Sequence, residues 1–147
     1  MSLATRHDRA DDSPGLLLWQ VSNRWQAAQR AALKPFDLTH VQFVLLAALT
    51  YLEPSGPVTQ RALADMAATD PMMTSQVLRT LEGRDLVHRP PHPTDRRARA
   101  VAVTEAGRDL VNQAVVAVEA CDTAFFAGLG GSLPAFIEAL RTLRELR

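Results

Sequence analysis

The segment between residues 70 and 103 constrains the fold more than any other part of the chain. A helix that opens at Asp70-Pro71 is followed by two short apolar runs, residues 86–89 and 100–103, which are typical of strands. The loop between these runs carries three arginines in four positions, at Arg96, Arg97 and Arg99. A helix followed by a basic-tipped hairpin predicts a winged helix-turn-helix. In such a unit the helix enters a DNA major groove while the hairpin reaches a neighbouring groove or the phosphates.

The charge of the chain is local rather than global. The 147 residues have a formal net charge of zero, which argues against a general polyanion binder, and 47% of them are hydrophobic, enough for one core. Positive charge gathers in residues 84–99, where five arginines face only Asp85 and Asp95. This distribution is a local footprint for phosphate.

Helix boundaries are marked by capping residues along the whole chain. Ser13 before Pro14 predicts a helix to about Leu33, and a Thr-x-x-Gln capping box at Thr39 begins a second, mostly apolar helix. We expect a short helix after Thr59, a long one after Thr104, and a last one whose leucines are spaced like a short heptad seam.

The helix that opens at Asp70-Pro71 has two distinct faces. The helical period places one set of residues against the core: Thr74, Val77, Leu78 and Leu81. The opposite face is predicted to contact DNA, and it presents Met72, Met73, Ser75, Gln76 and Arg79. Thr59 in the preceding helix and Arg96, Arg97 and Arg99 in the hairpin complete the predicted DNA-binding set.

The predicted fold class is mainly α with a small β-hairpin wing. Residues 1–13 are expected to form a flexible tail, and residues 36–104 the winged lobe. Residues 14–35 and 105–147 are expected to form a helical dimerisation region, because their helices carry more apolar surface than one small lobe can cover.

With these motifs in place, the chain resembles the MarR family of bacterial transcriptional regulators. The resemblance extends over about residues 16–110. It is carried by residues 38–43, 63–66 and 86–87, and above all by Asp95-Arg96-Arg97-Ala98-Arg99 and Val103-Thr104-Glu105-Ala106-Gly107. It implies a homodimer on a pseudo-palindromic operator, and often release of DNA by a small aromatic ligand or by oxidation. It also implies that Arg97 enters the minor groove, while Asp95 orients the wing or pairs with an arginine.

Two positions depart from the family pattern. Asp85 stands where the family has a glycine between the recognition helix and the wing, although aspartate tolerates the left-handed conformation better than most residues. Met72 and Met73 stand where serine or threonine usually reaches DNA, so contacts to thymine methyl groups replace hydrogen bonds in our interpretation.

A candidate effector pocket follows from the family resemblance. Trp19, Asn23, Trp25 and His40 would line it, between the helical platform and the DNA-binding lobe. The alternative is structural, since tryptophans on long helices are usually core or interface anchors.

The remaining chemistry-bearing residues favour structural roles. Cys121 lies late in a helix beside Glu119 and Asp122, which disfavours a reactive thiolate. His88 and His92 lack further ligands at zinc spacing, so we expect no metal and no cofactor.

The sequence therefore predicts a cytoplasmic, ligand-responsive transcriptional regulator, acting as a repressor. Its expected partners are double-stranded DNA, a second copy of the chain and a small aromatic effector. The alternative is a winged-helix module for protein interaction or DNA architecture without an effector. An enzyme is disfavoured because the chain has no phosphate loop, nucleophile elbow or metal-ligand cluster. We expect no membrane partner, since by our sequence interpretation no apolar run reaches the length that spans a membrane.

Overall fold

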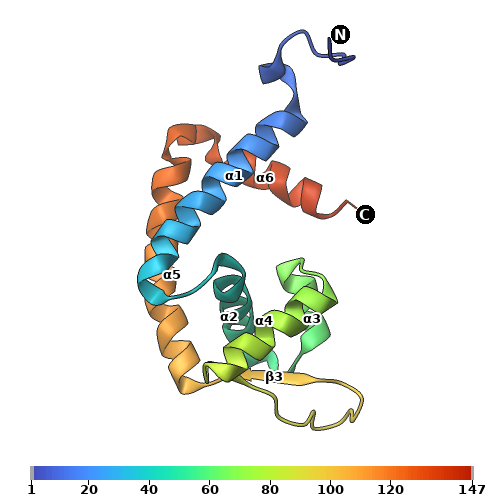
Figure 1. The fold of residues 1–147 in the computed structure, drawn as a ribbon, viewed down its shortest axis with the longest axis vertical. Coiled ribbons are helices and arrows are strands. Elements are labelled where there is room, and N and C mark those ends of the chain that lie inside the picture. The colour runs from blue at the N-terminus through green and yellow to red at the C-terminus, as the bar shows by residue number, and fades with distance from the viewer. Residues whose placement is uncertain (1, 147) are drawn as a thin grey trace.

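The computed structural model describes residues 2–146 and divides them into a lobe and a helical frame. In Figure 1, α1, α5 and α6 enclose a lobe built from α2, α3, α4 and the sheet. The helices are α1 (Pro14–Leu33), α2 (His40–Leu52), α3 (Gln60–Ala67), α4 (Pro71–Gly83), α5 (Glu105–Phe126) and α6 (Leu133–Arg144). The strands are β1 (Val58–Thr59), β2 (Val87–His88) and β3 (Ala100–Val103). Short 3-10 turns are η1 (Ala10–Asp12), η2 (Lys34–Phe36), η3 (Glu53–Ser55) and η4 (Ala127–Ser132).

The predicted capping residues begin the helices. Each accepts a hydrogen bond from a backbone N–H in the first turn, which satisfies a donor that the helix itself leaves unpaired. These residues are Ser13, Thr39, Thr59, Asp70 and Thr104. At Thr39 the reciprocal bond from Gln42 is also present, so the predicted capping box is confirmed.

The sheet has one more strand than the hairpin predicted from the sequence. Its order is β1-β3-β2, with both pairs antiparallel, and Val58 opposes Val101 while Val87 opposes Val103. Strand β1 is only two residues long, and its partner β3 lies more than 40 positions further along the chain. No local sequence pattern therefore predicted it. It ties the start of α3 to the wing.

The core lies inside the lobe and reaches the middle of α5. The predicted inward face of α4 is confirmed, with Thr74, Leu78 and Leu81 fully buried and Val77 packed against them. Helix α2 runs through the centre and buries Phe43, Leu45, Leu46, Ala48 and Leu49. Because α2 also contacts α1 and α5, the lobe and the frame share this core.

The turn after α4 keeps the left-handed conformation although aspartate replaces the glycine of the family pattern. Asp85 has a φ of 63°, and the amide of Leu86 donates to the carbonyl of Leu81 at 3.0 Å. This pairing is a Schellman motif with aspartate in the position that glycine favours. Ala68 ends α3 in the same way, with a φ of 54°.

The lobe joins α5 without a flexible linker. The hydroxyl of Thr104 donates to the carbonyl of Asp85 at 2.7 Å and accepts from the amide of Gly107 at 3.0 Å. A Cβ at Gly107 would collide with the carbonyl oxygen of Leu86, so only glycine fits there. Glu53 adds a second connection, accepting from the Val103 amide and from Arg108.

The ends of the chain differ in part from expectation. Within the tail predicted to be flexible, η1 forms a 3-10 turn immediately before the cap of α1. Met1 and Arg147, the outermost residues of the predicted tail and dimerisation region, lie outside the described residues.

The stretch Glu105–Arg144 contains an 18-residue window with a mean hydropathy of 1.4, which is long and apolar enough, by length and composition, to cross a membrane. By this measure, the expectation that no run is long enough was wrong. The stretch is interrupted at Gly130, whose φ of 52° is not helical, and α6 turns away from the line of α5 (Figure 1). Apolar helices that pack against a second subunit have the same composition.

Candidate DNA-binding surface

The exposed face of α4 carries the side chains predicted to reach DNA bases. Met72 and Met73 are 72% and 44% exposed. Gln76 and Arg79 are also exposed, while Ser75 is half-buried. An α-helix of ordinary width fits a major groove, so this face presents apolar contacts near its start and polar ones further along.

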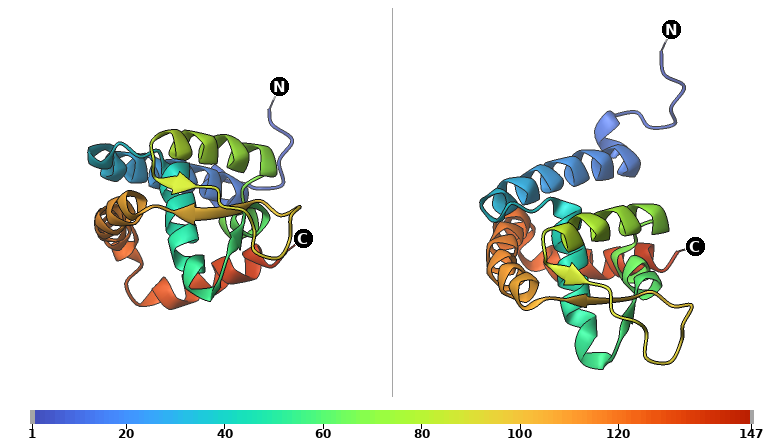
Figure 2. Two further views of the ribbon diagram at one scale, coloured as in Figure 1. Left: turned by 90° about the horizontal axis from the view of Figure 1, so that it is seen from below. Right: turned by 60° about the horizontal axis from the view of Figure 1, so that its bottom comes forward.

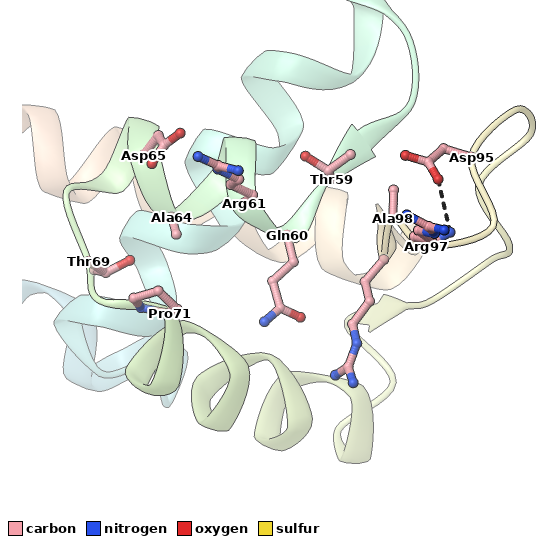
Figure 3. A pocket seen from close by; sticks show the side chains of 11 residues that line it. Thr59, Gln60, Arg61, Ala64, Asp65, Thr69, Pro71, Asp95, Arg97 and Ala98 are labelled. Carbon is pink, nitrogen blue, oxygen red and sulfur yellow. Dashed lines mark hydrogen bonds between the residues drawn. The ribbon is translucent and has the colours of Figure 1, made fainter.

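The wing tip is held in shape by its own polar side chains. His92 Nδ1 accepts from the amides of Thr94 and Asp95, at 3.2 and 3.0 Å. Asp95 Oδ1 accepts from the amide of Arg97 at 2.9 Å, drawn as a dashed line in Figure 3. Asp95 thus orders the loop backbone, which is one of the two roles that the family resemblance implied, and the side chain of Arg97 stays exposed.

A cleft of about 830 Å³ lies between α3, the start of α4 and the wing. Figure 3 shows Thr59, Gln60 and Arg61 on one side of it, and Asp95 and Arg97 on the other. Three of the predicted DNA-binding residues line the cleft, namely Thr59, Arg97 and Arg99. The α4 residues Met72 to Arg79 do not line it, and they present a separate face of the same lobe.

The five arginines of residues 84–99 fall into two groups. Arg84 donates to the carbonyl of Asp37 at 2.7 Å, and Arg89 donates to Gln60 Oε1 at 3.2 Å, so both are engaged inside the lobe. The exposed group is Arg96, Arg97 and Arg99. The predicted DNA-binding set contained only the exposed group, although the count of local charge took all five together. The partners of the other two arginines lie up to 47 positions away, so their contacts were not predicted.

Arg61 is a basic residue that sequence reasoning missed. It is exposed on α3 and lines the cleft opposite the wing arginines. Its position two residues after the capping Thr59, in the first turn of the helix that precedes α4, was the available signal. The cleft therefore carries guanidinium groups on both sides, an arrangement suited to a polyanion backbone.

Comparison with known proteins identifies the family. The MarR family model matches residues 38–98, which span α2, α3, α4 and most of the wing. The transcriptional regulator YdcH of Bacillus subtilis, whose function is uncharacterised, is 47% identical over 116 residues, covering 78% of this chain and 79% of YdcH. The chain belongs to the MarR family. It is a DNA-binding transcriptional regulator rather than an enzyme.

Two further similar proteins match nearly the whole chain. The transcriptional repressor Rv2887 of Mycobacterium tuberculosis is 34% identical over 138 residues, covering 93% of this chain and 96% of Rv2887. The structure of BpsR from Bordetella bronchiseptica has a TM-score of 0.86 at 27% identity, covering 96% of this chain and 99% of BpsR. That structure is described as a mechanism for regulation of DNA binding by 6-hydroxynicotinic acid.

The four residues predicted for a MarR-type effector pocket fall into two pairs. The rings of Trp25 and His40 meet edge to face, with centroids 5.0 Å apart. Asn23 donates to the carbonyl of Trp19 at 2.7 Å, and Trp19 is 68% exposed on the outer part of α1. The structure therefore brings Trp25 and His40 together and places Trp19 and Asn23 as a separate, exposed pair earlier on α1.

A polar cluster that sequence reasoning missed lies beside Trp25. Asp122 Oδ1 accepts from Trp25 Nε1 at 2.9 Å and from Gln29 Nε2 at 2.7 Å. Gln29 is fully buried, and its Oε1 has no hydrogen-bond partner. Burial lowers the pKa of His40, and nearby Arg30 lowers it further, while the charge of Asp122 partly opposes the shift. The cluster joins α1, α2 and α5.

Sites for other chemistry are limited. Among residues 2–146, no three His, Cys, Asp or Glu side chains gather closely enough to hold a metal. Cys121 is half-buried, and whether it has a redox role stays a prediction. An apolar groove of about 460 Å³ runs between α5, η4 and α6, lined by Phe126, Leu133, Phe136, Ile137 and Leu140.

Proposed function

We propose that this chain is a homodimeric repressor that binds a pseudo-palindromic operator in the cytoplasm and is released from it by a small-molecule effector. The observation that carries the proposal is the arrangement of the lobe. The exposed face of α4 and the exposed arginines of the wing belong to one rigid unit, held together through β1, β3 and α3. A helix in the major groove and an arginine in the adjacent minor groove then contact the same half-site.

The dimer is supported by apolar surface that the single chain leaves open. No residue of α6 is buried within the described part of the chain, and Ile137, Leu140 and Leu143 are 39–56% exposed. Helix α1 adds Leu17, Leu18 and Val21, at 40–56% exposed. Two copies joined through these helices would place two lobes on successive turns of one face of DNA, with half-sites on the order of 10 base pairs apart.

The effector part of the proposal rests on relatives. BpsR responds to 6-hydroxynicotinic acid, a small aromatic acid, in its control of DNA binding. The Trp25–His40 pair offers aromatic surface where α1, α2 and α5 meet. A ligand that prefers one spacing of the two lobes would shift the dimer away from the spacing that fits the operator.

The function is tested with operator variants. An operator is first selected from a random DNA pool with the purified protein. The affinity of each protein variant for this operator and for a panel of its single-base variants is then measured at fixed salt. Gln76→Ala should relax preference at one position per half-site, costing about 1–3 kcal/mol for the favoured base. Arg97→Ala should weaken binding overall and leave the preference for major-groove bases nearly intact. If Arg97→Ala instead altered major-groove preference, the placement of helix and wing would be wrong.

A second measurement separates the regulator from a constitutive architectural protein. Small aromatic acids, 6-hydroxynicotinic acid among them, are titrated into the complex with DNA. Loss of binding at saturating ligand supports effector control. Tight binding that no compound in the panel weakens favours the module without an effector.

A further inference from the structure

The guanidinium group of Arg89 joins three elements of the lobe. Arg89 directly follows β2, and its Nη1 donates to Gln60 Oε1 on α3 at 3.2 Å. Its Nη2 donates to the carbonyl of Ser75 in α4 at 3.4 Å, and its Nε lies 3.9 Å from a carboxylate oxygen of Glu82. The side chain is only 19% exposed. Arg89 is therefore directed into the lobe rather than toward solvent.

The contacts of Arg89 continue into the wing. Gln60, which begins α3 and points into the cleft in Figure 3, donates its backbone N–H to the carbonyl of Arg99 at 2.8 Å. A continuous path thus runs from Ser75 through Arg89 and Gln60 to Arg99. Its ends are the two surfaces that the proposed function assigns to the major and minor grooves.

The chemistry of arginine suits this position. The planar fork supplies several donors in fixed directions and keeps its charge at any working pH, whereas a lysine ammonium is a compact point charge. Glu82 compensates the half-buried cation, while Gln60 and Ser75 receive directed bonds. A lysine of the same charge would not span the acceptors on α3 and α4 together.

We propose that Arg89 is a positioning residue for DNA recognition. It fixes the distance between α4 and the wing, and so contributes to operator selectivity without touching DNA. The inference rests on the proposed function, because it presumes that helix and wing read the same half-site.

The test compares Arg89→Met with Arg84→Met, a matched loss of an arginine bonded inside the lobe but outside this path. Operator affinity, single-base discrimination and salt dependence are measured for each variant. We expect Arg89→Met to lower discrimination about fivefold to tenfold at helix-read and wing-read positions alike. The slope of affinity against salt should stay at the wild-type value, because no phosphate contact is lost. Arg89→Lys should remain impaired, and Arg84→Met should keep wild-type selectivity.

Three results would overturn the proposal. A salt slope that falls by about one in Arg89→Met would show direct phosphate contact. Selectivity equal to that of Arg84→Met would show a merely structural role, and full rescue by lysine would show a role of charge alone. If Arg89→Met does not fold, Gln60→Ala breaks the same path, and unaltered selectivity in that variant contradicts the proposal. Absence of any sequence preference in the wild-type protein would instead refute the proposed function.

Discussion

The winged lobe and the terminal helices bury their apolar side chains in different ways. In the lobe, Leu46, Leu49 and Leu78 are fully enclosed by the same chain. On α6, Leu140 and Leu143 are 42% and 56% exposed, and no residue of that helix is buried in the described chain. The lobe therefore has its core within one chain, whereas the terminal helices leave apolar surface open, which a second copy would cover in the dimer that we propose.

The largest effect should come from placing charge on the open face of α6. Leu140→Glu with Leu143→Glu would bury two carboxylates in the proposed dimer interface, so we expect the mass in solution to fall from twice 16.1 kDa to 16.1 kDa. Operator affinity should fall on the order of 100-fold, because each lobe then binds alone. Light scattering and DNA titration measure both. Tyr51→Glu, at a 74% exposed position of α2, is the control and should stay dimeric. A double variant that remains a dimer would contradict the comparison.

Cavity formation in the lobe should destabilise the chain itself. Leu46 is fully buried on α2, so Leu46→Ala should cost about 2–5 kcal/mol of unfolding free energy. Tyr51→Ala on the same helix should change it by less than about 0.5 kcal/mol. Urea denaturation of both variants provides the measurement. Equal losses in the two would mean that the core does not lie where the structure places it.

The contact between α1 and α5, inside the helical frame, should respond to loss of a hydrogen-bond acceptor. Asp122→Ala leaves the donors of Trp25 and Gln29 without their acceptor in a part-buried site, at a cost of about 1–3 kcal/mol. Asp122→Asn retains an oxygen acceptor and should cost less. Thermal unfolding ranks the two variants, and an alanine variant as stable as the wild type would show that water replaces the carboxylate.

Relief of backbone strain at the ends of α3 and α4 should stabilise the lobe slightly. Ala68 and Asp85 adopt positive φ values of 54° and 63°, so Ala68→Gly and Asp85→Gly should each add about 0.5–1 kcal/mol. Ala67→Gly, one residue earlier inside α3, should destabilise by a similar amount. The same unfolding assay compares them, and a loss at Ala68 as large as at Ala67 would refute the left-handed assignment.

The smallest effect should be a pH dependence of stability caused by His40, which packs against Trp25. The pKa of His40 is lowered from its usual 6.5, so the unfolded chain binds a proton more readily than the folded chain. This contribution to stability is complete above pH 6.5 and is lost as the pH falls through the lower folded-state pKa. His40→Gln should flatten that part of the stability profile between pH 7.5 and 5. A profile unchanged by the substitution would show that other groups cause the slope.

The parts of the fold that follow local rules could be predicted from the sequence. The helix starts at Ser13, Thr39 and Asp70 depend on hydrogen bonds within four residues, and the inward face of α4 follows from the helical period. The left-handed turn at Asp85 could be anticipated for the same reason.

The parts that depend on distant partners could not be predicted. Strand β1 is two residues long and exists through its pairing with β3. Gln29 and Asp122 lie 93 positions apart, and Arg89 meets Gln60 across 29 positions. A local pattern cannot identify such pairs, which explains why the contacts of Arg89 inside the lobe were not predicted.

Helix α5 begins directly at the lobe, without a linker, so this long helix can act as a lever arm. Its 22 residues extend about 33 Å, and Thr104 anchors the near end directly to the turn that follows α4. Because Gly107 packs against the backbone of Leu86 with no room to spare, the helix and the lobe turn together. A rotation of about 5° at the far end, near α6, would carry the near end about 3 Å. A small rotation within the helical frame would thus shift the lobe by about the rise of one base pair along DNA.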